Sequence, residues 1–200
     1  MALDSTQVAA LAGILSIAAY LPYGYDVLRG TVIPQRTSWL IWGLLSLIAF
    51  FSVLTSGGSD GLFFTGAQMM GTNTIFLLSL WRGTGSLAER ADFTVISLSA
   101  LGLGLWWWTD NPAWAMGLSI TIGTLGGLLT VAKAYRRPRS EALRPWALQW
   151  LAAALGVGSV IGTTALEVAY PLYLFLLYSG ILGATLIGRA LSRRSVTPSA

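Results

Sequence analysis

Seven stretches of this sequence contain no charged residue, and each is about as long as a helix that crosses a membrane. They cover residues 5–25, 37–59, 61–81, 93–109, 111–132, 145–166 and 168–188. A hydrocarbon core requires roughly 20 helical residues to cross. Because lipid offers no hydrogen bonds to the backbone, each stretch should satisfy its own as a helix. The sequence therefore predicts an all-α integral membrane protein with seven transmembrane helices.

The distribution of charge predicts an orientation in the lipid bilayer. Only 10% of the 200 residues are charged, against about 25% in a soluble domain. All twelve Lys and Arg residues fall in the loops after the first, third and fifth stretches or in the C-terminal tail. The positive-inside rule then places the N-terminus outside and the C-terminus in the cytoplasm. We expect an integral protein of the plasma membrane, which is the inner membrane in a bacterium. Its net charge of +4 reflects this topology, and we expect no nucleic-acid partner.

An internal repeat appears when the sequence is shifted by 107 residues. The pairs that coincide include rare charges and a tryptophan: Arg29 and Arg136, Trp39 and Trp146, Ser52 and Ser159, Arg82 and Arg189. Self-similarity at a fixed offset is typical of duplicated architecture. We predict a 3+1+3 arrangement, with a first three-helix repeat at 1–83, a spacer helix at 84–110, a second repeat at 111–190 and a cytoplasmic tail at 191–200. A single spacer helix makes the two repeats parallel across the membrane.

The stretches "YLPYGYDVLRGT" at 20–31 and "SWLIWGLLS" at 38–46 resemble the PQ-loop families, including the SWEET and SemiSWEET sugar transporters. Pro22 matches the family's Pro-Gln motif, with Tyr23 in place of Gln. The literal Pro34–Gln35 pair lies in the following loop and does not correspond to the motif. The second repeat has Leu129 at the position of Pro22, so the family's second proline is missing. The resemblance extends over the whole chain through its helix count and parallel repeat.

This resemblance implies a hinge and a solute ligand, and each has a simpler alternative. Pro22 would be the hinge of the inner gate, or only a static kink. Asn73, deep in the third helix, would bind the solute, or only form a hydrogen bond between helices. Asp26 and Lys133 are repeat equivalents of opposite charge. They would pair to close the cytoplasmic side, or remain two solvated loop charges.

Further candidate ligands carry hydroxyls or an aromatic face. Ser52 and Ser159 are equivalent residues of the two repeats, and Phe50 lies beside the first. Tyr178 and Ser179 stand near the place where the resembling family has a second Asn. The alternative for both serines is that small residues let helices approach closely. The same packing role is predicted for Gln68 and Gln149, and an aromatic belt at the two membrane interfaces for the nine tryptophans.

The residue types that are missing from the seven stretches restrict the function. The sequence has no Cys and no His, and no ionisable residue lies inside any charge-free stretch. Ion-coupled pumps keep such residues as proton relays, and a membrane enzyme needs a base, nucleophile or metal ligands. We therefore expect no enzyme, cofactor or metal, and a facilitator that moves a small, neutral, polar, sugar-like solute by alternating access. The alternative is a non-transporting seven-helix receptor or assembly partner. A homo-oligomer is compatible with either.

Overall fold

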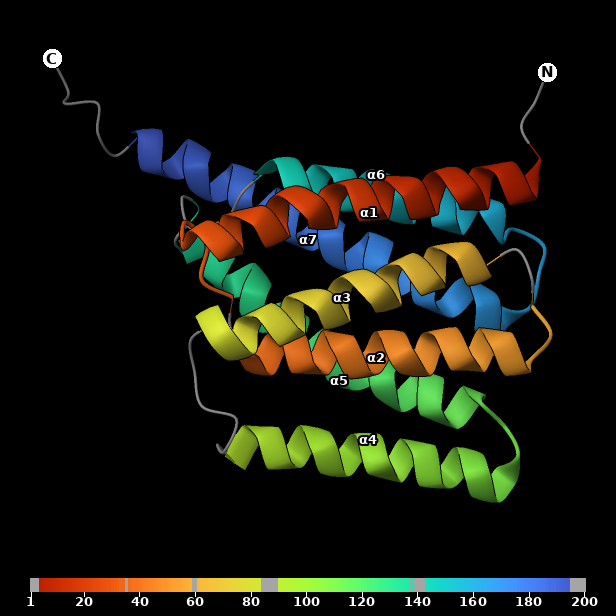
Figure 1. The fold of residues 1–200 in the computed structure, drawn as a ribbon. Coiled ribbons are helices and arrows are strands. Elements are labelled where there is room, and N and C mark those ends of the chain that lie inside the picture. Colours follow the sequence, from red (N-terminus) through yellow and green to blue (C-terminus); the bar gives the residue numbers. More distant parts are fainter. Residues whose placement is uncertain are drawn as a thin grey trace, which may run out of the picture.

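The computed structural model describes residues 4–34, 36–58, 61–83, 90–136, 138 and 143–194. These residues form seven α-helices and no β-strand. Figure 1 shows them as one antiparallel bundle, with the N-terminus and the C-terminus at opposite ends. The helices are α1 (Ser5–Arg29), α2 (Arg36–Thr55), α3 (Leu62–Arg82), α4 (Arg90–Thr109), α5 (Ala113–Arg136), α6 (Leu143–Ser159) and α7 (Ala165–Arg194). The predicted all-α class is confirmed.

Helix α1 has well-defined signals at both ends. Asp4 accepts a hydrogen bond from the Gln7 backbone N–H at 2.7 Å, and the Gln7 side chain accepts one from the Asp4 N–H, which completes a capping box. The helix continues through Pro22, which is exposed. It ends at Gly30, whose φ of 74° lies in the left-handed region that favours glycine.

The sixth helix is shorter than its charge-free stretch, and the seventh begins earlier. Helix α6 ends at Ser159, and the chain turns through Gly162, whose φ is 88°. Helix α7 then begins at Ala165, so Glu167 lies in its first turn and is only 7% exposed. Glu167 lies outside the charge-free stretches, as the sequence has it, but the structure places it inside a helix. A carboxylate is favourable there because it faces the positive end of the helix dipole.

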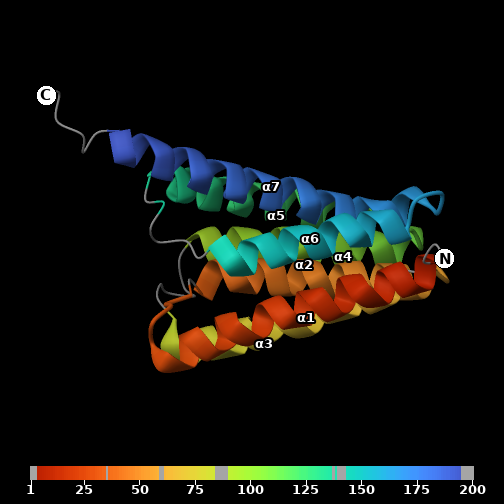
Figure 2. The ribbon, with the colours of Figure 1, turned by 90° about the horizontal axis from the view of Figure 1, so that it is seen from above.

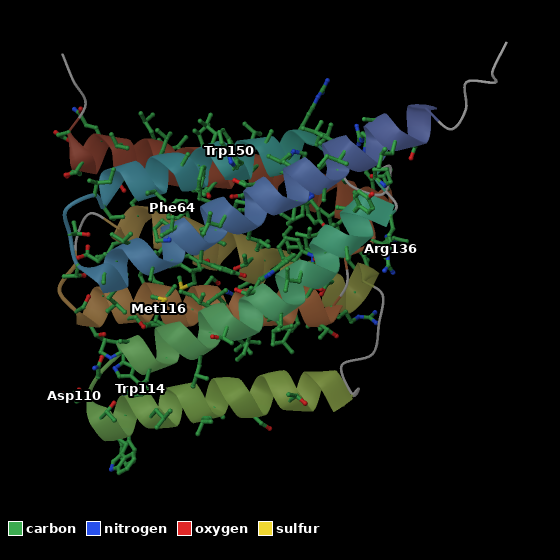
Figure 3. All side chains as sticks on the ribbon, turned by 180° about the vertical axis from the view of Figure 1, so that it is seen from behind. Phe64, Asp110, Trp114, Met116, Arg136 and Trp150 are labelled. Carbon is green, nitrogen blue, oxygen red and sulfur yellow. The ribbon has the colours of Figure 1, made fainter. Side chains whose placement is uncertain are left out.

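The basic residues gather at one end of the bundle. Arg29 ends α1, Arg36 begins α2 and Arg82 ends α3, and the C-terminal end of α7 lies at the same end of the bundle. Figure 3 shows Arg136 at this end and Asp110 at the other. We call these the basic end and the acidic end. In the part of the chain described, no Lys or Arg lies at the acidic end.

The outside of the bundle is rich in exposed apolar side chains, unlike the surface of a soluble protein, and its mainly apolar core also buries several polar side chains. Large apolar side chains face outward on most helices, including Leu21 (68% exposed), Met70 and Leu176. Soluble monomers rarely expose this much contiguous apolar surface. The helices α1, α2 and α5, together with Ala165–Ser192 of α7, are long and apolar enough to cross a membrane. The chain is thus compatible with membrane integration, and the seven crossings stay a prediction.

The helices pack in two similar groups. Helix α3 contacts both α1 and α2, and α7 contacts both α5 and α6. Figure 2 shows α1 and α3 on one side of the bundle and α5 and α7 on the other. The groups meet through α1 against α6 and α2 against α5, while α4 packs mainly on α5. Exchanging α1, α2 and α3 for α5, α6 and α7 leaves the main contacts within and between the two groups unchanged, whereas the contact of α4 with α5 has no counterpart on α1 among the main contacts.

Candidate solute-binding cavity

A cavity lies where the two groups of helices meet. Residues near the start of α2 and α6 line it, such as Trp39 and Pro145, so it occupies the half of the bundle nearer the basic end. The space between its walls, including its open mouth, is about 560 Å³. Only about 40 Å³ admits the centre of a water-sized molecule. Since one water needs roughly 10–15 Å³ on this measure, the cavity is narrow and holds a few waters in this conformation.

Aromatic rings form a large part of the cavity wall. Half of the lining residues are aromatic: Tyr20, Tyr23, Trp39, Trp42, Trp146, Tyr170 and Tyr178. The rings are in contact across four helices. Centroids lie 5.3 Å apart for Trp39 and Trp42, 6.3 Å for Trp42 and Trp146, and 5.7 Å for Trp146 and Tyr178. Edge-to-face pairs at such distances contribute about 0.5–1.5 kcal/mol each beyond their burial. The ring series connects the two helix groups.

A buried polar network stands beside these rings, and Gln149 is its centre. Its Oε1 accepts hydrogen bonds from the Ser16 hydroxyl and the Gln68 amide, both at 3.1 Å. Tyr20 donates its hydroxyl proton to Gln68, and Tyr178 faces both Tyr20 and Gln68. Ser16, Gln68 and Gln149 are each at most 5% exposed. Since an unpaired amide is costly away from water, this network holds α1, α3 and α6 in one arrangement.

Three buried polar atoms have no hydrogen-bond partner among the described residues: Trp42 Nε1, Tyr173 OH and Ser52 Oγ. Trp42 lies in the cavity wall. Its indole N–H and the Tyr173 hydroxyl are near enough to interact, but they do not meet the geometry of a hydrogen bond. Tyr173 packs against Gly123 of α5, where a Cβ would stand 2.6 Å from its hydroxyl oxygen. The two orphaned groups therefore lie at the junction between the helix groups.

One predicted site residue, Tyr178, lines the cavity, and the others lie elsewhere. Ser179 accepts a hydrogen bond from Trp150 Nε1 at 2.8 Å and donates to the backbone of α7. Ser159 donates to the Gly156 carbonyl within α6. Ser52 is fully buried in α2, and Phe50 packs on Gly66 of α3. Their roles in binding a solute stay predictions, which this geometry does not favour.

Asn73 connects α3 to α2. Its Nδ2 donates to the Gly43 carbonyl of α2 at 3.2 Å and to the Met69 carbonyl of its own helix at 2.8 Å. A Cβ at position 43 would stand 2.9 Å from the Asn73 Oδ1. Gly43 is therefore needed for this close approach. The residues that line the cavity do not include Asn73, so the contacts favour the interhelical alternative for this residue.

We expect Asn73→Ala to lower the free energy of unfolding by about 1 kcal/mol, because it removes the amide hydrogen bonds from α3 to Gly43 and Ser46 of α2. Solute affinity should not change. Thr74→Ala is the matched control, since the Thr74 side chain is exposed and bonds only its own helix. Reversible unfolding in detergent and a binding titration measure the two quantities. A tenfold loss of affinity at unchanged stability would restore the role of a solute ligand.

The predicted gate residues lie toward the basic end. Pro22 faces outward from α1, and Asp26 is half-buried in the last turn of the same helix. Lys133 belongs to α5, but its side chain lies outside the described part of the chain. The predicted Asp26–Lys133 pair is therefore untested. At the acidic end, Glu167 Oε1 accepts a hydrogen bond from the Thr164 hydroxyl at 3.1 Å. Its carboxylate also lies against Gly58 of the α2–α3 loop, so the two helix groups touch there.

The sequence did contain a signal for the cavity wall. Tyr20 and Tyr23, Trp39 and Trp42, and Trp146 and Gln149 are each three residues apart, so each pair shares one helix face. The tryptophans at the basic end were predicted to be a membrane belt. That prediction is wrong for Trp39, which is only 7% exposed. It agrees with Trp81, Trp107, Trp108 and Trp114, which are 52% to 89% exposed.

Comparisons with known proteins do not assign this fold or cavity. No family model, no curated protein and no solved structure matches the chain. No group of three or more acidic residues that could hold a metal ion occurs among the described residues. The function has to be argued from the cavity itself.

Proposed function

We propose that this protein is a membrane facilitator that moves a small neutral solute by alternating access. The single observation that supports this most is the narrow, aromatic-lined cavity at the junction of two similarly packed groups of three helices. Transporters with repeated halves bind their solute at such a junction near the middle of the membrane. The matching contacts of α1–α3 and α5–α7 support the predicted 3+1+3 repeat.

The lining of the cavity supports an uncharged solute. None of the described residues that line it carries a charge. Moving an ion into such surroundings is costly unless a counter-charge is present. A neutral solute has no such requirement. The apolar exterior of the bundle supports residence in the bilayer, and the contact of Glu167 with Gly58 at the acidic end is suited to a gate that opens when the groups separate.

Transport by purified protein in sealed vesicles tests this proposal. We expect labelled neutral solutes, with D-glucose and uracil as the first probes, to equilibrate faster than in protein-free vesicles. Collapse of the proton gradient should not change the rate. The rate should be nearly constant between roughly pH 5.5 and 8, because no histidine is present to titrate. A steep pH dependence would contradict the uncoupled mechanism. Solute binding without flux would favour the receptor alternative.

A further inference from the structure

The polar groups of the cavity wall are largely occupied by one another. Gln149 Oε1 already accepts two hydrogen bonds, and Tyr20 donates to Gln68. Thr72 donates to the Gln68 carbonyl at 2.7 Å and shares a hydrogen bond with Ser46. A sugar presents many hydroxyls, and each hydroxyl buried without a partner weakens binding. The wall therefore has few groups left to satisfy a sugar.

The wall instead suits a flat aromatic face. Tyr20, Trp39, Trp42, Trp146 and Tyr178 form a connected series of rings, with Trp39 and Trp42 perpendicular at 90°. A planar ring can lay its whole face against one of these rings, which a puckered ring cannot do. Stacking on aromatic side chains also stabilises any molecule that has a π face.

The wall also contains a donor that makes no hydrogen bond, although the Tyr173 hydroxyl lies near it. The indole N–H of Trp42 is buried and unpartnered. An indole nitrogen can only donate, so its complement is an acceptor such as a carbonyl oxygen. A carbonyl that enters beside the Trp42 ring would remove the cost of the orphaned N–H.

We propose that the solute is a flat, uncharged heteroaromatic ring that carries carbonyl acceptors, which is the chemistry of a nucleobase. This inference rests on the proposed function, and it replaces the sugar-like solute that the sequence predicts. The rings supply the stacking surface, and Trp42 Nε1 supplies the hydrogen bond that distinguishes a carbonyl-bearing ring from a purely apolar one.

Three probes separate the contribution of ring stacking from that of hydrogen bonding. Uracil is planar and neutral and has carbonyl acceptors. 5,6-Dihydrouracil keeps the same carbonyl and N–H groups on a puckered, non-aromatic ring. D-Glucose is neutral and rich in hydroxyls. Titration calorimetry with the full chain in nanodiscs should show uracil binding about tenfold more tightly than dihydrouracil, because only uracil stacks. Glucose should bind more weakly still.

Two matched variants test the role of Trp42. Trp42→Phe keeps a ring in the wall but removes the N–H, so uracil affinity should fall about fivefold. Thermal stability should hold or rise, since the N–H has no partner in the protein. Trp150→Phe removes an indole N–H that bonds Ser179 outside the cavity. It should lower thermal stability and leave uracil affinity unchanged.

Each outcome has a distinct meaning. Equal affinity for uracil and dihydrouracil, or tighter binding of glucose, would overturn the heteroaromatic assignment. An unchanged uracil affinity in Trp42→Phe would remove the role of its N–H. If glucose enters the vesicles and uracil neither binds nor enters, the facilitator stands and this inference fails. If neither probe binds nor enters the vesicles, the facilitator itself is rejected.

Discussion

Replacing Gln149 by Leu should lower the free energy of unfolding by about 2–4 kcal/mol. Gln149 Oε1 is the common acceptor for Ser16 and Gln68. Leucine has a similar volume but no acceptor, so two buried donors lose their partner at once. Each orphaned donor costs roughly 1–3 kcal/mol. The Ser16 hydroxyl can instead donate to a carbonyl of its own helix. The total cost of the substitution is therefore lower than the sum for two orphaned donors. Reversible denaturation of the protein in bicelles or detergent measures the change.

Ser16→Ala is the matched control for this prediction. It removes one donor and leaves Gln149 Oε1 with its second hydrogen bond from Gln68. Its cost should stay below about 1 kcal/mol. If Gln149→Leu were no less stable than Ser16→Ala, the network would have no structural role. Gln68 and Gln149 would then have only the packing role that the sequence predicts for them.

Replacing Gly71 by Ala should disturb both the fold and the cavity. The ring of Tyr20 lies directly on Gly71, and a Cβ at position 71 would overlap ring atoms. Helices α1 and α3 must then separate, or Tyr20 must swing away and lose its hydrogen bond to Gln68. Overpacking of this kind costs about 1–3 kcal/mol. Because Tyr20 lines the cavity, solute affinity should fall roughly tenfold as well.

A double-mutant cycle attributes the effect to that contact. Combined with Tyr20→Val, Gly71→Ala should cost much less stability than it does alone, because the overlapping ring is gone. Gly117→Ala in α5 is the control glycine, since nothing lies within 4 Å of a Cβ there. It should be neutral or stabilising by up to about 1 kcal/mol, as expected when Ala replaces Gly in a helix. Additive effects of the two substitutions at positions 71 and 20 would contradict the proposed contact.

Charge and hydropathy were sufficient to predict the elements. Each charge-free stretch lies largely within one helix, as expected for segments whose backbone would have few other ways to satisfy its hydrogen bonds in lipid. The basic loops lie at one end because consecutive helices alternate in direction. The boundaries were less predictable. The stretch 145–166 contains no charge, yet α6 ends at Ser159, because the chain turns at Gly162, with its left-handed φ. Charge and hydropathy alone do not predict such a turn.

The cavity was not predictable in the same way, for a physical reason. A membrane helix is apolar on its lipid face and mostly apolar on its protein face, so hydropathy does not determine how it rotates about its axis. Only the packed bundle shows that Trp39 faces inward while Trp81 faces outward. The contact of Gln149 with Ser16 likewise joins positions 133 residues apart. The sequence by itself determined the helices, the apolar exterior and the basic end. Tertiary packing decided which polar and aromatic side chains meet, because that depends on helix rotation and close approach at positions such as Gly71.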